Sequence, residues 1–260
     1  MAAAVCALAV ALLPSGASAS GAAWDLNAFD LCKQVGLPYV DDNASGATYN
    51  SDTGSLWVVT RSPNHLVELS QRGEFLRKVS WHGFDDPEGV AWVGGHYLAV
   101  VEEPTHGGIT VVNVAPGVAD VYQGRTAVGI EVWSNAGLEG IAYNHQKGVY
   151  YVVQEKGPKR VVEVHKSGYH KELFNLESVG VGDLSGIYYS SSIDNLFILS
   201  QESRSVIRLA MDGNSVQQRW DIGGDRPEGI AFTPDGQKMF IVSEPRSMSV
   251  YSTNGCDGIY

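Results

Sequence analysis

Short apolar runs, each bounded by glycine and polar turn residues, recur along almost the whole chain. Five segments share one pattern, in which a small or acidic residue precedes a glycine and an apolar strand follows it. These segments are Ala44–Tyr49, Pro87–Trp92, Leu138–Tyr143, Leu184–Tyr189 and Pro227–Phe232. Their glycines are 43, 51, 46 and 43 residues apart. This period is typical of a four-stranded propeller blade.

Each of the five units continues with a turn and two further apolar strands. The turns are rich in Gly, Asp and Asn, which favour tight backbone turns. We expect second strands over Leu56–Val59, Tyr97–Val101, Val149–Val153, Leu196–Leu199 and Met239–Val242. We expect third strands over Leu66–Leu69, Ile109–Val114, Val161–Val164, Val206–Leu209 and Ser249–Tyr251. A weaker fourth strand follows, and no segment of the mature chain sustains helical spacing with caps, so the sequence predicts an all-β fold.

The two ends of the repeat predict how the ring closes. The fifth unit ends soon after its third strand, and the segment Trp24–Leu31 precedes the first unit. We predict that this segment supplies the outer strand of the last blade, because an open ring leaves unpaired strand edges. The predicted fold is therefore a five-bladed β-propeller with four-stranded antiparallel blades, closed by the N-terminal strand. A β-sandwich of similar length would not explain the glycine period.

The N-terminal segment predicts the compartment. Residues Ala2–Leu13 form an apolar run that is too short to span a bilayer as a helix, and Ala17–Ala19 offers a small-x-small cleavage site. We expect residues 1–19 to be a signal peptide and residues 20–260 a single propeller domain, secreted or otherwise extracytoplasmic (periplasm, cell exterior or an organelle lumen). A buried N-terminal helix is the alternative. The absence of a basic residue before the apolar run also fits a misannotated start or a segment that targets an organelle lumen. No later run of about 18 apolar residues predicts a membrane span.

Cleavage of the signal peptide leaves two cysteines, Cys32 and Cys256, one near each end of the mature chain. Ring closure brings these two positions together, and an extracytoplasmic compartment permits disulfides. We therefore predict a Cys32–Cys256 disulfide. Two unpaired thiols are the alternative if the signal-peptide assignment is wrong.

Composition and charge narrow the range of partners. The chain is 44% hydrophobic and 18% charged, which is enough apolar residues for a large core. Its formal net charge is -11, and it has no basic tract, so a nucleic-acid partner is excluded as the leading candidate. An acidic protein of this kind attracts cations instead.

Two columns of residues carry the candidate chemistry. The first strand of each blade lines the central channel, so equivalent positions form a ring. The positions before the repeat glycines are Ser45, Glu88, Glu139, Ser185 and Glu228. The positions after the second strands are Arg61, Glu103, Glu155, Glu202 and Glu244. Carboxylates this close repel one another unless a cation or a proton intervenes.

Calcium fits the first ring, because it accepts six to eight hard oxygen ligands in flexible geometry. We predict a calcium site at Glu88, Glu139 and Glu228, with Ser45, Ser185, Glu103, Glu155, Glu202 and Glu244 as weaker candidates. The alternative is structural. The ring glutamates then bond backbone N–H groups of the neighbouring blade, and Arg61 pairs with a glutamate of the second column.

The signature stretches also resemble a known family. They are Gly83–Ala91, Gly137–Tyr143, Asp183–Ile187, Arg226–Phe232 and Val242–Pro245. They are similar to the SdiA-regulated family of extracytoplasmic propellers, and the resemblance spans roughly residues 36–251. It implies a five-bladed propeller with a bound calcium ion and no established enzymatic activity.

Two functions are consistent with these observations. The first is a non-catalytic, calcium-binding propeller, expected to be a monomer, that binds a small ligand or a protein. The second is a calcium-dependent hydrolase of the lactonase, esterase or phytase type, for which fold analogy is the only argument. The sequence contains no G-x-S-x-G elbow and no H-E-x-x-H zinc motif, and we favour the binding function.

Overall fold

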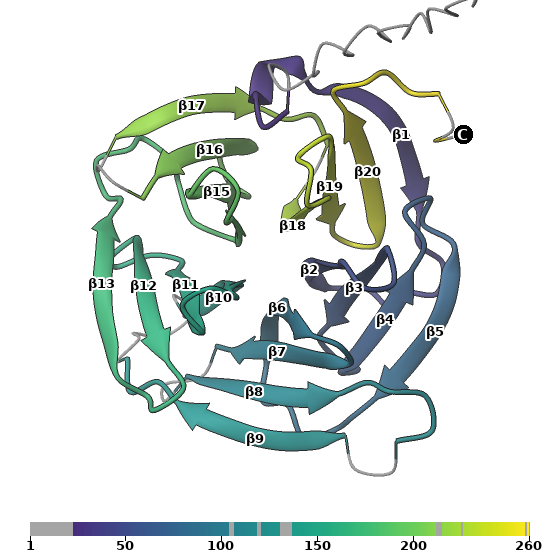
Figure 1. Cartoon of the computed structure of the whole chain (residues 1–260), viewed down its shortest axis with the longest axis vertical. Coiled ribbons are helices and arrows are strands. Elements are labelled where there is room, and N and C mark those ends of the chain that lie inside the picture. Colours follow the sequence, from purple (N-terminus) through teal and green to yellow (C-terminus); the bar gives the residue numbers. More distant parts are fainter. Residues whose placement is uncertain are drawn as a thin grey trace, which may run out of the picture.

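The structure is a computed structural model, and it describes residues 23–103, 107–118, 121–130, 137–211, 215–224, 226–257 and 259. Five four-stranded antiparallel sheets surround a central channel (Figure 1). In four of the five sheets, which are the blades of the propeller, the strands follow one another in chain order from the channel outward. The predicted five-bladed propeller is therefore confirmed. The expected signal peptide lies outside the described residues.

Four blades are built from consecutive strands. Blade 1 consists of β2 (Ala44–Asn50), β3 (Ser55–Thr60), β4 (His65–Leu69) and β5 (Phe75–Ser80). Blade 2 consists of β6 (Pro87–Gly94), β7 (Tyr97–Glu102), β8 (Gly108–Asn113) and β9 (Tyr122–Ala127). Blade 3 consists of β10 (Leu138–Asn144), β11 (Val149–Gln154), β12 (Arg160–His165) and β13 (His170–Asn175). Blade 4 consists of β14 (Gly186–Ser190), β15 (Asn195–Ser200), β16 (Ser205–Ala210) and β17 (Val216–Asp221).

Burial explains why the four strands of a blade differ in sequence. Every residue of β3, β11 and β15 is buried, because both faces of these strands pack against neighbouring blades. They therefore read as unbroken apolar runs. The outer strands β5, β9 and β17 instead alternate exposed and half-buried residues, which is why their pattern is weak in the sequence.

Blade 5 closes the ring with strands from both ends of the chain. It consists of β18 (Pro227–Phe232), β19 (Lys238–Ser243), β20 (Ser247–Ser252) and, outermost, β1 (Asp30–Gly36). The closing strand β1 pairs antiparallel with β20, as predicted, and it lies beside β20 in Figure 1.

The bounds predicted for the closing strand were wrong, because β1 begins at Asp30 and not at Trp24. The preceding residues form a short 3-10 helix, η1 (Leu26–Ala28), whose first turn is capped by the Asp25 side chain. Trp24 and Phe29 are buried with Phe197 and Phe232 between blades 4 and 5. This segment thus anchors the closing strand through apolar contacts, and the strand itself starts after it.

The predicted disulfide is present. Cys32 of β1 and Cys256 beyond β20 are bonded across a sequence separation of 224 residues. The bond joins the two ends of the domain at the seam of the ring. Among the described residues, no helix is long and apolar enough to cross a membrane.

The repeat glycines form a ring around the channel, which we call the glycine girdle: Gly46, Gly89, Gly140, Gly186 and Gly229. Each lies against the backbone of the neighbouring inner strand. A Cβ atom on Gly140 would lie 2.8 Å from the Cα atom of Gly186, and one on Gly46 would lie 2.8 Å from the Cα atom of Gly89. Real Cβ atoms do not come this close to backbone, so the fixed glycine period follows from the contact between inner strands.

The girdle predicts a steric cost for a single methyl group. We expect Gly140→Ala to lower the free energy of unfolding by about 1–3 kcal/mol, the range for overpacking a well-packed core. The matched control is Gly223→Ala, where a Cβ atom meets nothing within 4 Å. Urea denaturation of both variants measures the difference, and equal stabilities would show that the inner strands do not need glycine.

The seam predicts a second effect on stability. We expect the double variant Cys32→Ser, Cys256→Ser to lose stability, because the unfolded chain is no longer constrained by a closed loop with a sequence separation of 224 residues. Chain-entropy models put the upper limit at about 5 kcal/mol. Guanidinium denaturation with and without reductant measures it. Reductant should destabilise the parent protein and leave the double variant unchanged, and a parent protein insensitive to reductant would contradict the expectation.

Candidate functional site

The residues before the girdle glycines form a ring that we call the acidic ring: Ser45, Glu88, Glu139, Ser185 and Glu228. It lies at the end of the channel where the inner strands begin. The ladder between the first and second strands is irregular at this end in four blades, with register shifts between Ala44 and Gly46, Pro87 and Gly89, Leu138 and Ile141, and Pro227 and Gly229. A bulge leaves a residue out of the pairing and re-aims its side chain. The residue before the girdle glycine is placed in this way in blades 1, 2, 3 and 5.

A repeated hydrogen bond brings the second column of residues close to this ring. The backbone N–H of the residue after the second strand donates to the carbonyl of the residue three positions before the girdle glycine. The pairs are Arg61 to Asn43, Glu103 to Asp86, Glu155 to Gly137 and Glu244 to Arg226, with N···O distances of 2.9–3.2 Å. In blade 4, β15 ends at Ser200 and the register places Gln201, not the predicted Glu202, at this position. The Glu202 N–H, one residue later, donates to the carboxylate of Asp183.

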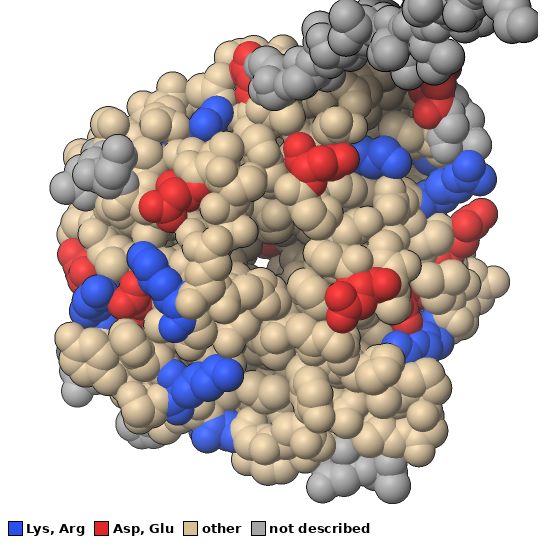
Figure 2. All heavy atoms as spheres, viewed as in Figure 1, with Lys and Arg blue, Asp and Glu red and all other residues tan. Residues whose placement is uncertain are grey.

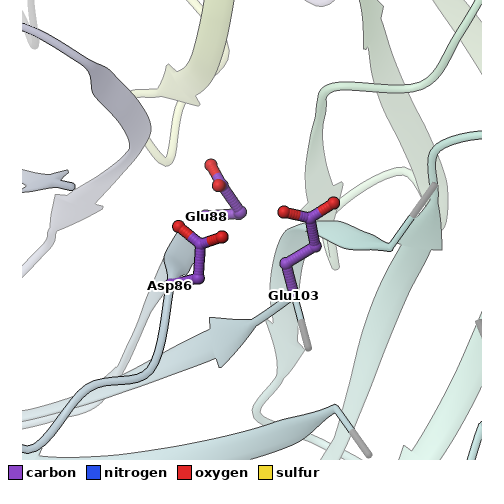
Figure 3. A group of neighbouring side chains, drawn as sticks. All are labelled: Asp86, Glu88 and Glu103. Carbon is purple, nitrogen blue, oxygen red and sulfur yellow. The ribbon is translucent and has the colours of Figure 1, made fainter. Parts of the chain in front are cut away.

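In blade 2 this arrangement assembles a compact acidic group of Asp86, Glu88 and Glu103. One ligand oxygen from each carboxylate lies within 4.8 Å of the others, and the side chains face one another in Figure 3. Glu88 is buried, at 6% exposure, while Asp86 and Glu103 are half-buried. We call these three residues the acidic triad.

Arg61 of blade 1 partly neutralises the acidic triad. Its guanidinium donates to Glu88 Oε1 at 2.6 Å and to Asp86 Oδ1 at 3.4 Å. Three carboxylates therefore face one cation, and two negative charges are left over when all three are ionised. Burial raises the pKa of Glu103 most, and the charge and hydrogen bond of Asp86 raise it further.

Burial and mutual repulsion keep protons on the acidic ring. Burial is the largest cause for Glu88, whose pKa rises to about 8 although Arg61 opposes the rise. Burial likewise raises the pKa of Glu228 to about 8. The pKa of Glu139 is raised well above its ordinary value by burial and then by the neighbouring carboxylates, of which Glu88 acts most strongly. Positive charge supplied at the ring would lower these pKa values and favour ionisation at neutral pH.

Most of the second column is engaged in ion pairs, but Arg61 pairs with Glu88 and Asp86 and not, as the structural alternative expected, with a glutamate of the second column. Lys156 lies 3.0 Å from Glu155 and 2.8 Å from Glu202, and Arg226 lies 2.8 Å from Glu244. Glu103 differs because it joins the acidic triad.

Of the predicted calcium ligands Glu88, Glu139 and Glu228, only Glu88 belongs to the acidic triad. Glu139 and Glu228 interact electrostatically with it across the channel, and Gln201 donates a hydrogen bond to Glu228. The ring hydroxyls donate to backbone carbonyls, Ser45 to Asn43 and Ser185 to Pro227. The predicted three-blade ligand set stays a prediction.

Sequence reasoning missed Asp86. It belongs to a third repeat column, three positions before each girdle glycine: Asn43, Asp86, Gly137, Asp183 and Arg226. Of its two aspartates, Asp183 is bound by the Ser200 hydroxyl and the Glu202 N–H. Comparing the third column with the second column would have placed Asp86 beside Glu103.

Comparison with known proteins finds one matching family and several solved structures of similar fold. The model of the family described as SdiA-regulated matches residues 24–252. Among solved structures, the chain is similar to a glutaminyl cyclase from Myxococcus xanthus, with 14% identity, a TM-score of 0.61, and coverage of 86% of this chain and 96% of that chain. It is also similar to a luciferin-regenerating enzyme, with 13% identity, a TM-score of 0.53, and coverage of 84% and 94%. A chain of a nidogen–laminin complex matches with 13% identity, a TM-score of 0.55, and coverage of 76% and 71%. At these identities the likeness shows the fold alone.

The raised pKa values predict how stability varies with pH in metal-free protein. Glu88 and Glu228 have pKa values of about 8 when folded, against 4.5 as the ordinary value. Between these two pH values the folded state binds more protons than the unfolded chain, so the free energy of unfolding falls as pH rises. Denaturation in EDTA between pH 5 and pH 8 should show this fall, and Glu228→Gln should weaken it. A stability that rises across this window would contradict the expectation.

Proposed function

The chain belongs to the SdiA-regulated family, and on that premise we propose that it is a calcium-binding propeller that acts outside the cytoplasm as a non-catalytic module for a small ligand or a protein. The observation that carries this proposal is the acidic triad, in which oxygens of Asp86, Glu88 and Glu103 lie within 4.8 Å of one another.

The chemistry of the acidic triad suits calcium. Its potential ligand atoms are all carboxylate oxygens, whereas zinc sites use histidine and cysteine. The two negative charges that Arg61 leaves uncompensated match a divalent cation. Magnesium fits less well, because it demands small octahedral geometry and sheds water reluctantly.

The proposed ligands are Asp86, Glu88 and Glu103, and the ring carboxylates Glu139 and Glu228 of other blades interact electrostatically with Glu88. Bound calcium supplies the positive charge that allows buried carboxyls to ionise near neutral pH. The protein itself holds the three carboxylates in position. The bond from the Glu103 N–H to the Asp86 carbonyl, 3.0 Å long, holds the two loops together, and the girdle fixes Glu88 beside them.

The proposal that the protein acts outside the cytoplasm is supported by the Cys32–Cys256 bond, because structural disulfides persist in oxidising compartments.

A calcium-dependent hydrolase is the second candidate, favoured by one feature of the ring. Half-buried Glu228 has a pKa of about 8, which suits a group that transfers protons near neutral pH. Two of the similar structures are named as enzymes, although fold likeness alone does not carry activity. A panel of ester, lactone and phosphate substrates tests this candidate. Calcium-dependent turnover that is lost in Glu228→Gln would replace the binding function with a catalytic one.

Calcium binding predicts a specific thermal response. At 100 times its dissociation constant, calcium should stabilise the metal-stripped protein by about 2.7 kcal/mol, which corresponds to a rise in Tm of roughly 5–10 °C. Magnesium should shift Tm less. In Glu103→Gln we expect the calcium shift to shrink, while the metal-free Tm stays equal or rises, because a repulsive charge is removed.

The control is Glu172→Gln on the outer strand β13, paired with Arg160 at 3.3 Å and remote from the channel. It should keep the full calcium response. Glu139→Gln tests whether the ligand set extends beyond the acidic triad. A smaller calcium shift would include Glu139 among the ligands, and an unchanged shift would limit them to the triad. If calcium leaves Tm unmoved in the parent and Glu103→Gln behaves like it, the triad only packs the blades.

A further inference from the structure

The channel opens at its other end into a separate cavity of about 140 Å³. Figure 2 shows a hollow at the centre of the ring, bordered mainly by uncharged side chains, with acidic and basic side chains further out on this face. The side chains of Ile141, Ile187 and Ile230 line both this cavity and the narrow channel at the girdle. These aliphatic side chains therefore form a floor between the cavity and the acidic ring.

Aromatic residues from all five blades gather at this end of the channel. Each inner strand places an aromatic residue three positions after its girdle glycine: Tyr49, Trp92, Tyr143, Tyr189 and Phe232. Tyr188 lines the cavity as well. Tyr49, Trp92, Tyr143 and Tyr188 are only half-buried, so each keeps some exposed surface. Tyr189 and Phe232 are buried and pack against Tyr151 and Phe197 of blades 3 and 4.

Two aspartates lie next to lining residues of the cavity. Asp52 and Asp235 follow the lining residues Ser51 and Pro234 directly in the chain. Asp235 lies close enough to raise the pKa values of Tyr49 and Tyr188 beyond the effect of burial.

The turns that join the first and second strands carry three aspartates and one lysine: Asp52, Asp194, Asp235 and Lys147. The Tyr143 ring already contacts a cation. Lys166 Nζ lies 5.7 Å from the centre of the Tyr143 ring, and Lys166 lines a different cavity. The mouth is thus aromatic and net negative.

We propose that this aromatic mouth binds a small organic cation, with a trimethylammonium group as the chemistry it accepts. Aromatic faces attract quaternary ammonium groups, and they do so more strongly when water is excluded. The aspartates add charge complementarity, which disfavours anions, and the hydroxyls of Ser190, Ser191 and Ser192 line the cavity for a polar tail on the ligand. The only compact set of potential metal ligands among the described residues lies at the other end of the channel, so a bare metal ion is not the expected occupant.

The test uses choline and its neutral isostere, 3,3-dimethylbutan-1-ol, which has the same shape without the charge. Titration calorimetry of the intact protein should show saturable binding of choline and at least tenfold weaker binding of the isostere. Trp92→Leu should weaken choline binding by roughly tenfold, and Trp92→Phe should restore part of it. Asp235→Asn should weaken it severalfold, and the loss should shrink at high salt.

The control is Tyr169→Leu, which removes an aromatic side chain that is 61% exposed and lies outside the cavity. It should bind choline like the parent. The proposal is overturned if choline does not bind at millimolar concentration, if the isostere or a neutral sugar binds as well as choline, or if folded Trp92→Leu retains full affinity. Choline binding should persist in Glu103→Gln without calcium, so a failed calcium site leaves this test intact.

Discussion

The contact between the five inner strands is the constraint on which the rest of the structure depends. At the girdle, backbone meets backbone, and no side chain fits between neighbouring strands. This close approach sets the width of the channel, and in four of the five blades the residue before the glycine lies in a bulged or irregular position at one mouth. The same contact directs the residues after each glycine to the other mouth. The two ends of the channel therefore differ in chemistry because they lie on opposite sides of one ring of glycines.

The close contact is possible only while the ring is shut. The closing strand β1 covers the edge of β20, and Trp24 and Phe29 bury an apolar anchor between blades 4 and 5. The Cys32–Cys256 bond then ties the seam covalently. Strand pairing, apolar packing and a covalent bond thus act at one place, where the chain would otherwise leave two free edges.

Closure also confines like charges. Five blades each bring a polar residue to one mouth, and three of these residues are glutamates. Where a basic residue is near, as for Glu155, Glu202 and Glu244, the charge is compensated by an ion pair. At Asp86, Glu88 and Glu103 a single guanidinium faces three carboxylates, and the pKa of Glu88 rises to about 8. Lys156 is shared by two carboxylates and Arg61 by three, so the acidic triad is where the most carboxylates face one basic side chain.

The sequence by itself determined the number of blades, the closing strand and the disulfide, because these follow from a glycine period and from what the two chain ends leave unpaired. It also determined which residue types reach the channel, since equivalent repeat positions share one place in a ring. The tertiary structure alone decided which of them meet. Asp86 joins Glu103 through a backbone hydrogen bond between two loops, and Lys156 joins two glutamates of different blades. The start of β1 at Asp30 depended on the packing of Trp24 between blades. These outcomes depend on contacts between chain segments that are distant in sequence, and a local pattern does not encode them.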